Sequence, residues 1–503
     1  MVAWRGEQER REWSATLDVA RLETAGWRPV PFREFVLKIH SRCDLACDYC
    51  YMYTMADQSW HTRPMVMSPA TLEATATRIA EHARAHDLSS VEVILHGGEP
   101  LLAGPAFISD AVWVLRTAMP AQAQVNISIQ TNGVSLDERY LDLLKRLGVR
   151  VGVSIDGAAA AHDRHRRFAN GTGSFRHVAV AVQRLASPAY RDMFGGLLCV
   201  VDVTNDPVTT YDALAAYEPP LLDFLLPHGN WMAPPPGRAA GSAATPYADW
   251  LIAAFDRWYG TERGAPKVRL FTEIMHALLG GAAATEAIGL SPAAVAVIET
   301  DGSIEQSDSL KSAYADAPYT GAHVAGDSFD ALLRMPGFAA RQIGSAGLCD
   351  ECQKCPVVQV CGGGHYAHRY RAGRGMLNPS VYCLDLFKLI WHIRGVMESG
   401  IRLLPRATEG RLEGRWVEVE LQSLSERDRL RIGMVLAERQ PHAPLGVRRE
   451  LSGPVLSAVR SQIKCQVECA AERHRMAVPE HGAQPGQGVL AEFHGSVSVA
   501  KRR

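Results

Sequence analysis

The chain has 503 residues, which at about 150 residues per domain is enough for roughly three domains or one large domain with additions. Apolar residues make up 47% and charged residues 21%, a balance that excludes a disordered or collagen-like chain. The formal net charge is -1, so no global field attracts nucleic acid or an anionic membrane to it.

The N-terminal residues do not resemble a secretory signal, and the chain has no apolar run typical of a membrane span. Charged residues occupy the N-terminus where a secretory signal needs an apolar stretch, and no uninterrupted apolar run reaches about 18 residues. We therefore predict a cytoplasmic protein with no membrane and no nucleic-acid partner. Eight of the 11 cysteines lie in two clusters, at residues 43–50 and 349–383, and clustered cysteines in such a chain indicate metal or redox sites rather than disulfides.

Between residues 33 and 235, short apolar runs alternate with helical patterns such as those at residues 68–86 and 136–147. Strands are predicted at residues 35–40, 91–95, 125–129, 151–155, 196–201 and 221–226. Six βα units of this kind predict the α/β class, with a parallel sheet that curls into a partial (β/α)6 barrel of the TIM type. Its chemistry is expected at the C-terminal ends of the strands.

The rest of the chain has different patterns. Helices are expected near 246–259 and 269–280, and beyond them a strand at 416–421 and helices near 423–438 and 453–472. The predicted domains are an N-terminal extension at 1–32, the barrel at 33–235, a helical bridge at 236–290, a Gly- and Cys-rich domain at 291–395, and a C-terminal region at 396–503 with a polar tail.

The strongest chemical signal follows the first predicted strand, where Cys43, Cys47 and Cys50 have the spacing Cys-x3-Cys-x2-Cys. Three thiolates on a tight loop can hold three irons of a 4Fe-4S cluster and leave the fourth iron open to a substrate or cofactor. The alternative is a zinc site, but structural zinc requires four closed ligands and no fourth cysteine is nearby.

This loop resembles the radical S-adenosylmethionine (SAM) superfamily, and the resemblance extends over residues 33–235. It implies that Tyr49 lies by the adenine of the cofactor. It also implies that Gly97-Gly98-Glu99-Pro100, after the second strand, receives the methionyl amino group. A glycine pair alone would indicate only a tight turn.

Two further strand ends carry motifs of the same family. Gln130-Thr131-Asn132-Gly133 resembles a turn whose polar side chains, Gln130 and Asn132, face the cofactor. The segment Ser154-Ile155-Asp156-Gly157 leads to Arg166, and the resemblance implies that Ser154 contacts the ribose while Arg166 pairs with the methionyl carboxylate. Arginine is chemically suited to hold a carboxylate.

A second cluster comprises Cys349, Cys352, Cys355, Cys361 and Cys383. On spacing alone, the last four could hold zinc or a second 4Fe-4S cluster. The pattern resembles the SPASM extension of radical peptide-modifying enzymes, which favours one auxiliary 4Fe-4S cluster and leaves Cys349 as a thiol that could exchange with a neighbouring ligand.

The full SPASM pattern has two auxiliary clusters, and this sequence departs from it. Ser307 stands at an upstream cysteine position and His365 stands where a further cysteine would be. We therefore expect the first auxiliary cluster to be absent.

Several segments, including LHGGEPLLAG and CGGGHYAHRYRAG, resemble the FxsB-type radical SAM/SPASM maturases. This resemblance implies an enzyme that joins an aromatic ring carbon to the β-carbon of a nearby residue in a ribosomally made precursor peptide, forming a cyclophane. Its implied partners are that peptide and a flavodoxin- or ferredoxin-like electron donor. Asp308 is the predicted catalytic base, because sulfatase-maturing relatives carry an aspartate there, with Glu299 and Glu305 as the next candidates.

Three alternatives remain open. One is oxidation of Ser or Cys in the manner of anaerobic sulfatase maturases, another is thioether formation, and the third is a silent scaffold with structural zinc. Residues 1–32 are too few for a winged-helix recognition domain, so residues 396–503 are the candidate for peptide recognition or for a stabilising cap.

Overall fold

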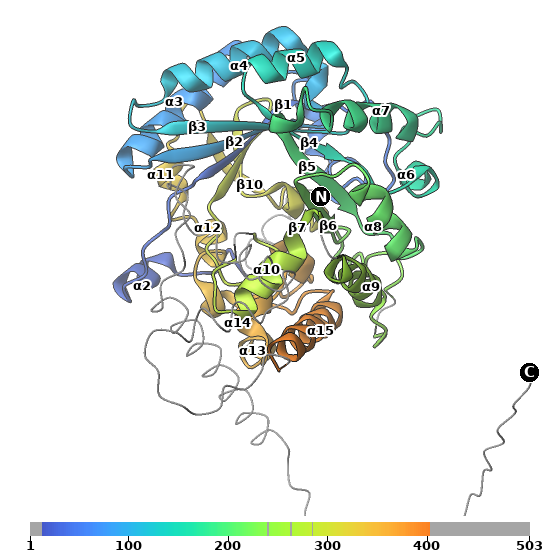
Figure 1. Cartoon of the computed structure of the whole chain (residues 1–503). Helices are drawn as coiled ribbons and strands as arrows, with labels where there is room; N and C mark the ends of the chain where they lie inside the picture. The colour runs from blue at the N-terminus through green and yellow to red at the C-terminus, as the bar shows by residue number, and fades with distance from the viewer. Residues whose placement is uncertain (1–12, 239–240, 262–263, 284, 403–503) are drawn as a thin grey trace, which may run out of the picture. The chain divides into compact units, whose positions relative to one another are not determined.

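The computed structural model describes residues 13–238, 241–261, 264–283 and 285–402. Its described residues contain a ten-stranded sheet with the order β10-β9-β8-β1-β2-β3-β4-β5-β6-β7 (Figure 1). The strands are β1 (Glu34–His40), β2 (Ser90–Gly97), β3 (Gln124–Thr131), β4 (Arg150–Ser154), β5 (Phe194–Val200), β6 (Leu221–Leu225), β7 (Lys267–Val268), β8 (Val295–Ile298), β9 (Ser303–Glu305) and β10 (Tyr319–His323).

The first six strands pair in parallel in chain order, with β10 and β7 at the two ends of the sheet. All six predicted strands are confirmed to within a few residues, and the open sheet is the partial barrel that was expected. The connecting helices are α3 (Pro69–Ala85), α4 (Pro105–Ala118), α5 (Glu138–Arg146), α6 (Ala159–His165), α7 (Phe175–Leu185) and α8 (Pro207–Ala215).

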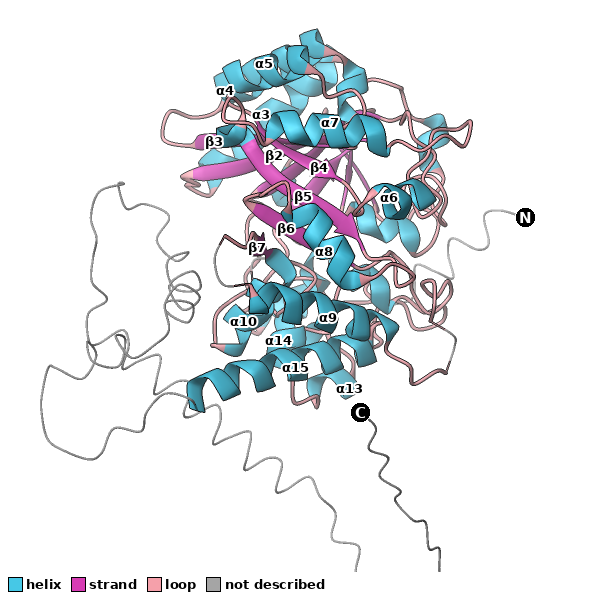
Figure 2. Cartoon of the chain, turned by 45° about the vertical axis from the view of Figure 1, so that its right-hand side comes forward, coloured by secondary structure: helices cyan, strands magenta, loops and turns pink. Residues whose placement is uncertain are grey.

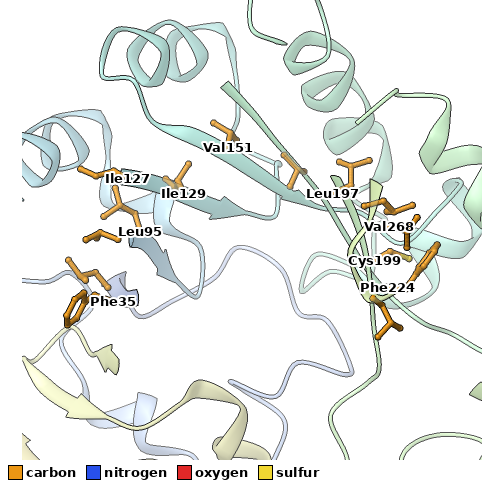
Figure 3. Packing of buried hydrophobic residues seen from close by; sticks show 14 of the residues in the cluster. Phe35, Leu95, Ile127, Ile129, Val151, Leu197, Cys199, Phe224 and Val268 are labelled. Carbon is orange, nitrogen blue, oxygen red and sulfur yellow. The ribbon is translucent and has the colours of Figure 1, made fainter. Parts of the chain in front are cut away.

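Alternate side chains of each strand face opposite sides of the sheet. Phe35 and Leu37 on β1 and Leu95 on β2 are fully buried in the apolar layer beneath the helices, part of which is shown in Figure 3. Lys38 and His96 alternate with them and so occupy the other face. A charged residue within an apolar strand therefore points into the half-barrel.

Residues 295–323 extend this sheet. β8 pairs in parallel with β1, from Glu34 opposite Val295 to Leu37 opposite Ile298, while β9 and β10 continue antiparallel. The sequence patterns did not predict these three short strands. Their pairing brings the segment after β9, which contains Asp308, to the barrel.

The predicted bridge helices are confirmed as α9 (Pro246–Gly260) and α10 (Arg269–Leu278). They pack with α15 (Cys383–Arg402) at the end of the molecule away from α3, α4 and α5 (Figure 2). The remaining helices are short: α2 (Val19–Thr24), α11 (Phe329–Leu332), α12 (Pro336–Ala340), α13 (Asp350–Gln353), α14 (Val358–Cys361), and the 3-10 turns η1 (Ser59–Thr62), η2 (Pro100–Ala103), η3 (Arg191–Met193), η4 (Asp308–Ser312), η5 (Gly344–Gly347) and η6 (Tyr366–Arg369).

The strand and helices predicted within 416–472 lie outside the described residues. None of the helices in the described part of the chain is long and apolar enough to cross a membrane.

Candidate active site

The loop that follows β1 carries Cys43, Cys47 and Cys50 as free thiols. The Leu45 backbone N–H lies 3.4 Å from the Cys43 sulfur, and the Asn132 side-chain amide lies 3.6 Å from it. Burial raises the pKa of Cys47 to about 11, opposed by Arg166, and raises the pKa of Cys43 and Cys50 as well. Three half-buried thiols with raised pKa values need a cation to become thiolates, which fits a metal cluster.

The glycine pair of the second motif packs against this loop. The backbone N–H groups of Gly98 and Glu99 donate to the carbonyls of His40 and Arg42 at 2.8 and 3.0 Å. A Cβ on Gly97 would lie 2.2 Å from the His40 carbonyl oxygen, and one on Gly98 would lie 2.5 Å from the Arg42 carbonyl oxygen. Glycine is therefore required for the cysteine loop to close on the end of β2.

Glu99 is completely buried between the second and third motifs, just before Pro100 begins η2. Its carboxylate accepts from the Thr131 hydroxyl at 2.7 Å, the Asn132 N–H at 2.7 Å and the Leu101 N–H at 3.0 Å. Burial raises the pKa of Glu99 to about 7, although these hydrogen bonds oppose the shift. Glu99 therefore titrates near neutral pH.

The third and fourth motifs also make contact. The Gln130 amide donates to the Ser154 hydroxyl at 3.0 Å. Asp156 accepts from the Tyr49 hydroxyl and from Arg166 Nε, the latter at 2.8 Å. The Arg166 guanidinium also lies 5.5 Å from the centre of the Tyr49 ring. Arg166 thus has an internal partner in Asp156, and its predicted pairing with the methionyl carboxylate stays a prediction.

Asp308, the predicted base, forms an ion pair with the buried Lys38 of β1. Lys38 Nζ also donates to His96 Nδ1 at 2.9 Å, which fits a neutral His96, because burial and Lys38 lower the pKa of His96 to about 4. Burial acts to raise the pKa of Asp308, but Lys38 and neighbouring groups lower it below its usual value. Asp308 Oδ1 is buried without a hydrogen-bond partner. An ionised carboxylate with one unpartnered oxygen can accept a proton.

Glu299 and Glu305, the other candidate bases, are already paired. Lys311 Nζ lies 3.0 Å from Glu299 and 2.7 Å from Glu305, and Arg63 binds Glu305 at 2.6 Å. Sequence reasoning missed Lys38, Lys311 and Arg63. The only available signal for Lys38 was a cation within the apolar run FVLKIH.

The second cysteine cluster surrounds a cavity of about 70 Å³. Cys352, Cys355, Cys361 and Cys383 all line this cavity, whereas the buried Cys349 is not among its lining residues. Cys352 lies in α13, Cys355 follows that helix, Cys361 ends α14 and Cys383 begins α15. Four converging thiols fit either of the two metal groups considered for them, a 4Fe-4S cluster or zinc.

The first auxiliary cluster was expected to be absent, and the residues near Ser307 carry hydroxyl, carboxylate and guanidinium groups. Ser307 Oγ forms a hydrogen bond of 2.8 Å with Ser309. Arg341 makes a bidentate ion pair with Glu286, with N···O distances of 2.8 and 2.6 Å. Burial raises the pKa of Glu286, but Arg341, with a smaller effect from His365, brings it down to about 2.

The family comparison is consistent with this geometry. Residues 37–212 match the family model of the radical SAM superfamily. These residues form a radical SAM domain.

The chain is similar to two curated relatives over most of the length of each relative. The serine-type anaerobic sulfatase-maturating enzyme of Klebsiella aerogenes is 26% identical over 365 residues, which is 70% of this chain and 84% of the relative. The cysteine-type enzyme of Clostridium perfringens is 24% identical over 359 residues, 70% of this chain and 94% of the relative. The solved structure of native anSMEcpe with bound AdoMet has a TM-score of 0.64 at 21% identity, covering 74% of this chain and 99% of that one, and so has the same fold.

Proposed function

We propose that this radical SAM enzyme modifies a ribosomally made precursor peptide by joining an aromatic ring carbon to the β-carbon of a nearby residue. The observation that carries the proposal is Asp308, an ionised carboxylate paired with Lys38 that keeps one buried oxygen unpartnered. Such a crosslink requires a base for the ring proton, and Asp308 is the base that we propose.

Cys43, Cys47 and Cys50 are the proposed ligands of the 4Fe-4S cluster that cooperates with S-adenosylmethionine. When bound, the two groups supply hydrogen-atom abstraction from an unactivated carbon. The chain has to bind and orient them, and Asn132 does part of this by linking the cysteine loop to β3: its amide donates to Asp44 at 2.7 Å. A flavodoxin- or ferredoxin-like protein is the proposed electron donor.

The cofactor-facing residues have distinct proposed tasks. Glu99 would accept the methionyl ammonium, and Arg166 would hold the methionyl carboxylate while Asp156 fixes its orientation. Tyr49 would lie by the adenine, and Ser154 would contact the ribose in the rotamer that Gln130 favours. Arg166 caps the C-terminus of α6, and the other side chains come from the ends of β2, β3 and β4 or from the cysteine loop, where a cofactor could bind them together.

The crosslink removes two hydrogens from the peptide overall. One leaves the β-carbon as a hydrogen atom, and the other leaves the ring as a proton and an electron once the carbon–carbon bond has formed. Asp308 would take that proton at Oδ1, since Lys38 keeps the carboxylate ionised. Cys352, Cys355, Cys361 and Cys383 would hold a single auxiliary cluster, whose chemistry is electron acceptance.

Similarity to the sulfatase-maturating enzymes favours a second candidate, oxidation of a Ser or Cys side chain to an aldehyde. Crosslinking and serine oxidation both remove two hydrogens, so intact mass does not separate them. An aldehyde reacts with a hydrazide probe, whereas a cyclophane does not and instead suppresses peptide fragmentation between the joined residues.

The test is anaerobic co-expression of the chain with a library of short peptides that contain an aromatic residue, a spacer residue and a serine. Tandem mass spectrometry before and after hydrazide treatment should show hydrazide-negative products that have lost two hydrogens, with no fragments between the aromatic residue and its partner. Products that all react with hydrazide would contradict the crosslink and support the second candidate.

A further inference from the structure

Three histidines from two distant segments converge inside the protein. His228 follows β6, while His365 and His368 follow the Gly362–Gly364 turn. Their ring centres are 5.5 Å apart for His228–His365, 5.3 Å for His228–His368 and 5.0 Å for His365–His368. One potential ligand nitrogen from each ring lies within 4.8 Å of the other two.

Neighbouring contacts hold these rings in place. The Tyr382 hydroxyl donates to the Pro227 carbonyl at 2.6 Å, and its ring lies 5.0 Å from the ring of His368. On the other side, the ring of Tyr51, which follows Cys50, lies 4.7 Å from His228. The cluster is therefore preorganised, and folding rather than a ligand brings the rings together.

The rings are neutral and incompletely satisfied. Burial lowers the pKa of His228 to about 3 and also lowers the pKa of His365 and His368. Each neutral imidazole has one nitrogen lone pair available to a metal. The Nδ1 atom of His365 is buried without a hydrogen-bond partner, an arrangement that costs stability unless something binds there. The Nε2 atom of His368 faces the Nδ1 atom of His228 at 3.2 Å.

The positive charges of the arginines near the three rings are accompanied by carboxylates. Arg369 donates to the carbonyls of Gly362 and Gly364, at 2.7 and 2.6 Å, and, in addition to burial, its positive charge contributes to the lowered pKa of His365 and His368. Arg341 forms an ion pair with Glu286. The negative charge of Asp308 acts to raise the pKa of His228, so it favours a positive charge at that ring.

We propose that His228, His365 and His368 bind a divalent transition-metal cation such as zinc, with one coordination position left exchangeable. The 3.2 Å between His368 Nε2 and His228 Nδ1 is close to the ~3.3 Å that separates two nitrogens on a tetrahedral zinc at about 2.05 Å. Three imidazoles with an open position make a site for catalysis or substrate binding rather than a closed structural site. This site is separate from both cysteine clusters and does not depend on the proposed peptide chemistry.

Two other groups of potential ligands in the described residues are already occupied. His82 and His86 both bond to Asp330, at 2.5 and 2.9 Å. In the other group, Lys311 pairs with Glu299 and Glu305, and Lys38 pairs with Asp308. The first group provides a control, because His86 is a partly exposed histidine that should not contribute to the buried site.

The test uses the chain after anaerobic reconstitution of its clusters with iron and sulfide. The protein is loaded with Zn²⁺, desalted, and analysed for zinc content and by X-ray absorption at the zinc edge. We expect about one retained zinc per chain with nitrogen or oxygen neighbours at about 2.0–2.1 Å and no sulfur at about 2.3 Å. His365→Gln and His368→Gln should weaken zinc retention more than about 100-fold, and His86→Gln should not.

Absence of retained zinc in the wild-type protein would overturn the proposal and leave the rings as a hydrogen-bonded pair with a neighbour. Sulfur ligation, or zinc that survives both substitutions, would also overturn it. If His365→Gln or His368→Gln loses iron as well as zinc, His228→Gln tests the same site from the other segment of the chain. The X-ray absorption spectrum of the wild-type protein distinguishes nitrogen from sulfur ligands without any variant.

Discussion

The two cysteine clusters differ in the number of thiols that they offer to a metal. The loop with Cys43, Cys47 and Cys50 lies at the strand ends and offers three thiols beside the polar groups of β2, β3 and β4. The segment from Cys349 to Cys383 places four thiols around a cavity of about 70 Å³. Three ligands leave a coordination position for a substrate or cofactor, whereas four close the site. If both regions bind the proposed clusters, the first would leave its metal open to chemistry and the second would enclose a resident group.

The largest expected effect separates the two regions directly. Replacing Cys43, Cys47 and Cys50 together by alanine should abolish S-adenosylmethionine cleavage, because no ligands of the first cluster remain. The iron content should fall from about eight to about four atoms per chain, while the fold is retained because the loop closes only one strand end. Iron analysis, circular dichroism and chromatography of deoxyadenosine measure these outcomes.

A triple variant that still forms deoxyadenosine would disprove the radical assignment. About twelve irons in the wild-type protein would instead show that a further cluster occupies the region of Ser307 and His365.

The same comparison shows what the sequence could predict. The six parallel strands were predictable because each is a local apolar run, and Cys43 was identifiable from the spacing of the three cysteines. Glu99, Asn132 and Asp156 were identified by resemblance to radical SAM motifs at the strand ends. The parallel order then brings these strand ends together.

Contacts between distant segments were not predictable. The pairing of Lys38 with Asp308 depends on β8 adding to β1, and a four-residue strand has almost no periodic signal. The approach of His228 to His368 likewise depends on tertiary packing over 140 residues of chain. The internal partner of Arg166, Asp156, was missed because the sequence indicates a cation but not which carboxylate is nearest.

The second-largest effect concerns the proposed base. Asp308→Asn should retain cofactor cleavage and hydrogen abstraction but lower crosslinked product about 10²- to 10⁴-fold, because an amide keeps the shape and cannot accept the proton. Deoxyadenosine and product are quantified in the same reaction. Glu305→Gln is the matched control: it removes a buried acid of the same segment, and crosslinking normalised to folded protein should persist.

Normal crosslinking by Asp308→Asn would remove this residue from the mechanism. Loss of crosslinking in the Glu305 variant, with deoxyadenosine formation retained, would transfer the role to Glu305.

A smaller effect concerns pH and the open cluster. Burial raises the pKa of Glu99 to about 7, and only its ionised form can bind the methionyl ammonium. Cofactor affinity should therefore be full above about pH 7 and fall by about tenfold per pH unit below it. Equilibrium dialysis between pH 6 and 8.5 measures the slope. Glu99→Gln should bind weakly at every pH, and the control Glu92→Gln should keep the wild-type slope; a flat wild-type profile would contradict this role of Glu99.

The smallest expected effect tests which thiols belong to the closed site. Cys383 lines the cavity with Cys352, Cys355 and Cys361, whereas Cys349 is buried beside Cys352 but does not line it. Cys349→Ser should therefore keep about eight irons per chain, while Cys383→Ser should lose about four. Serine is close in size to cysteine, so both changes disturb packing little and the difference reports ligation. Equal loss of iron in the two variants would make Cys349 a ligand. If the wild-type protein itself contained only about four irons together with zinc, the closed site would hold zinc instead of a 4Fe-4S cluster.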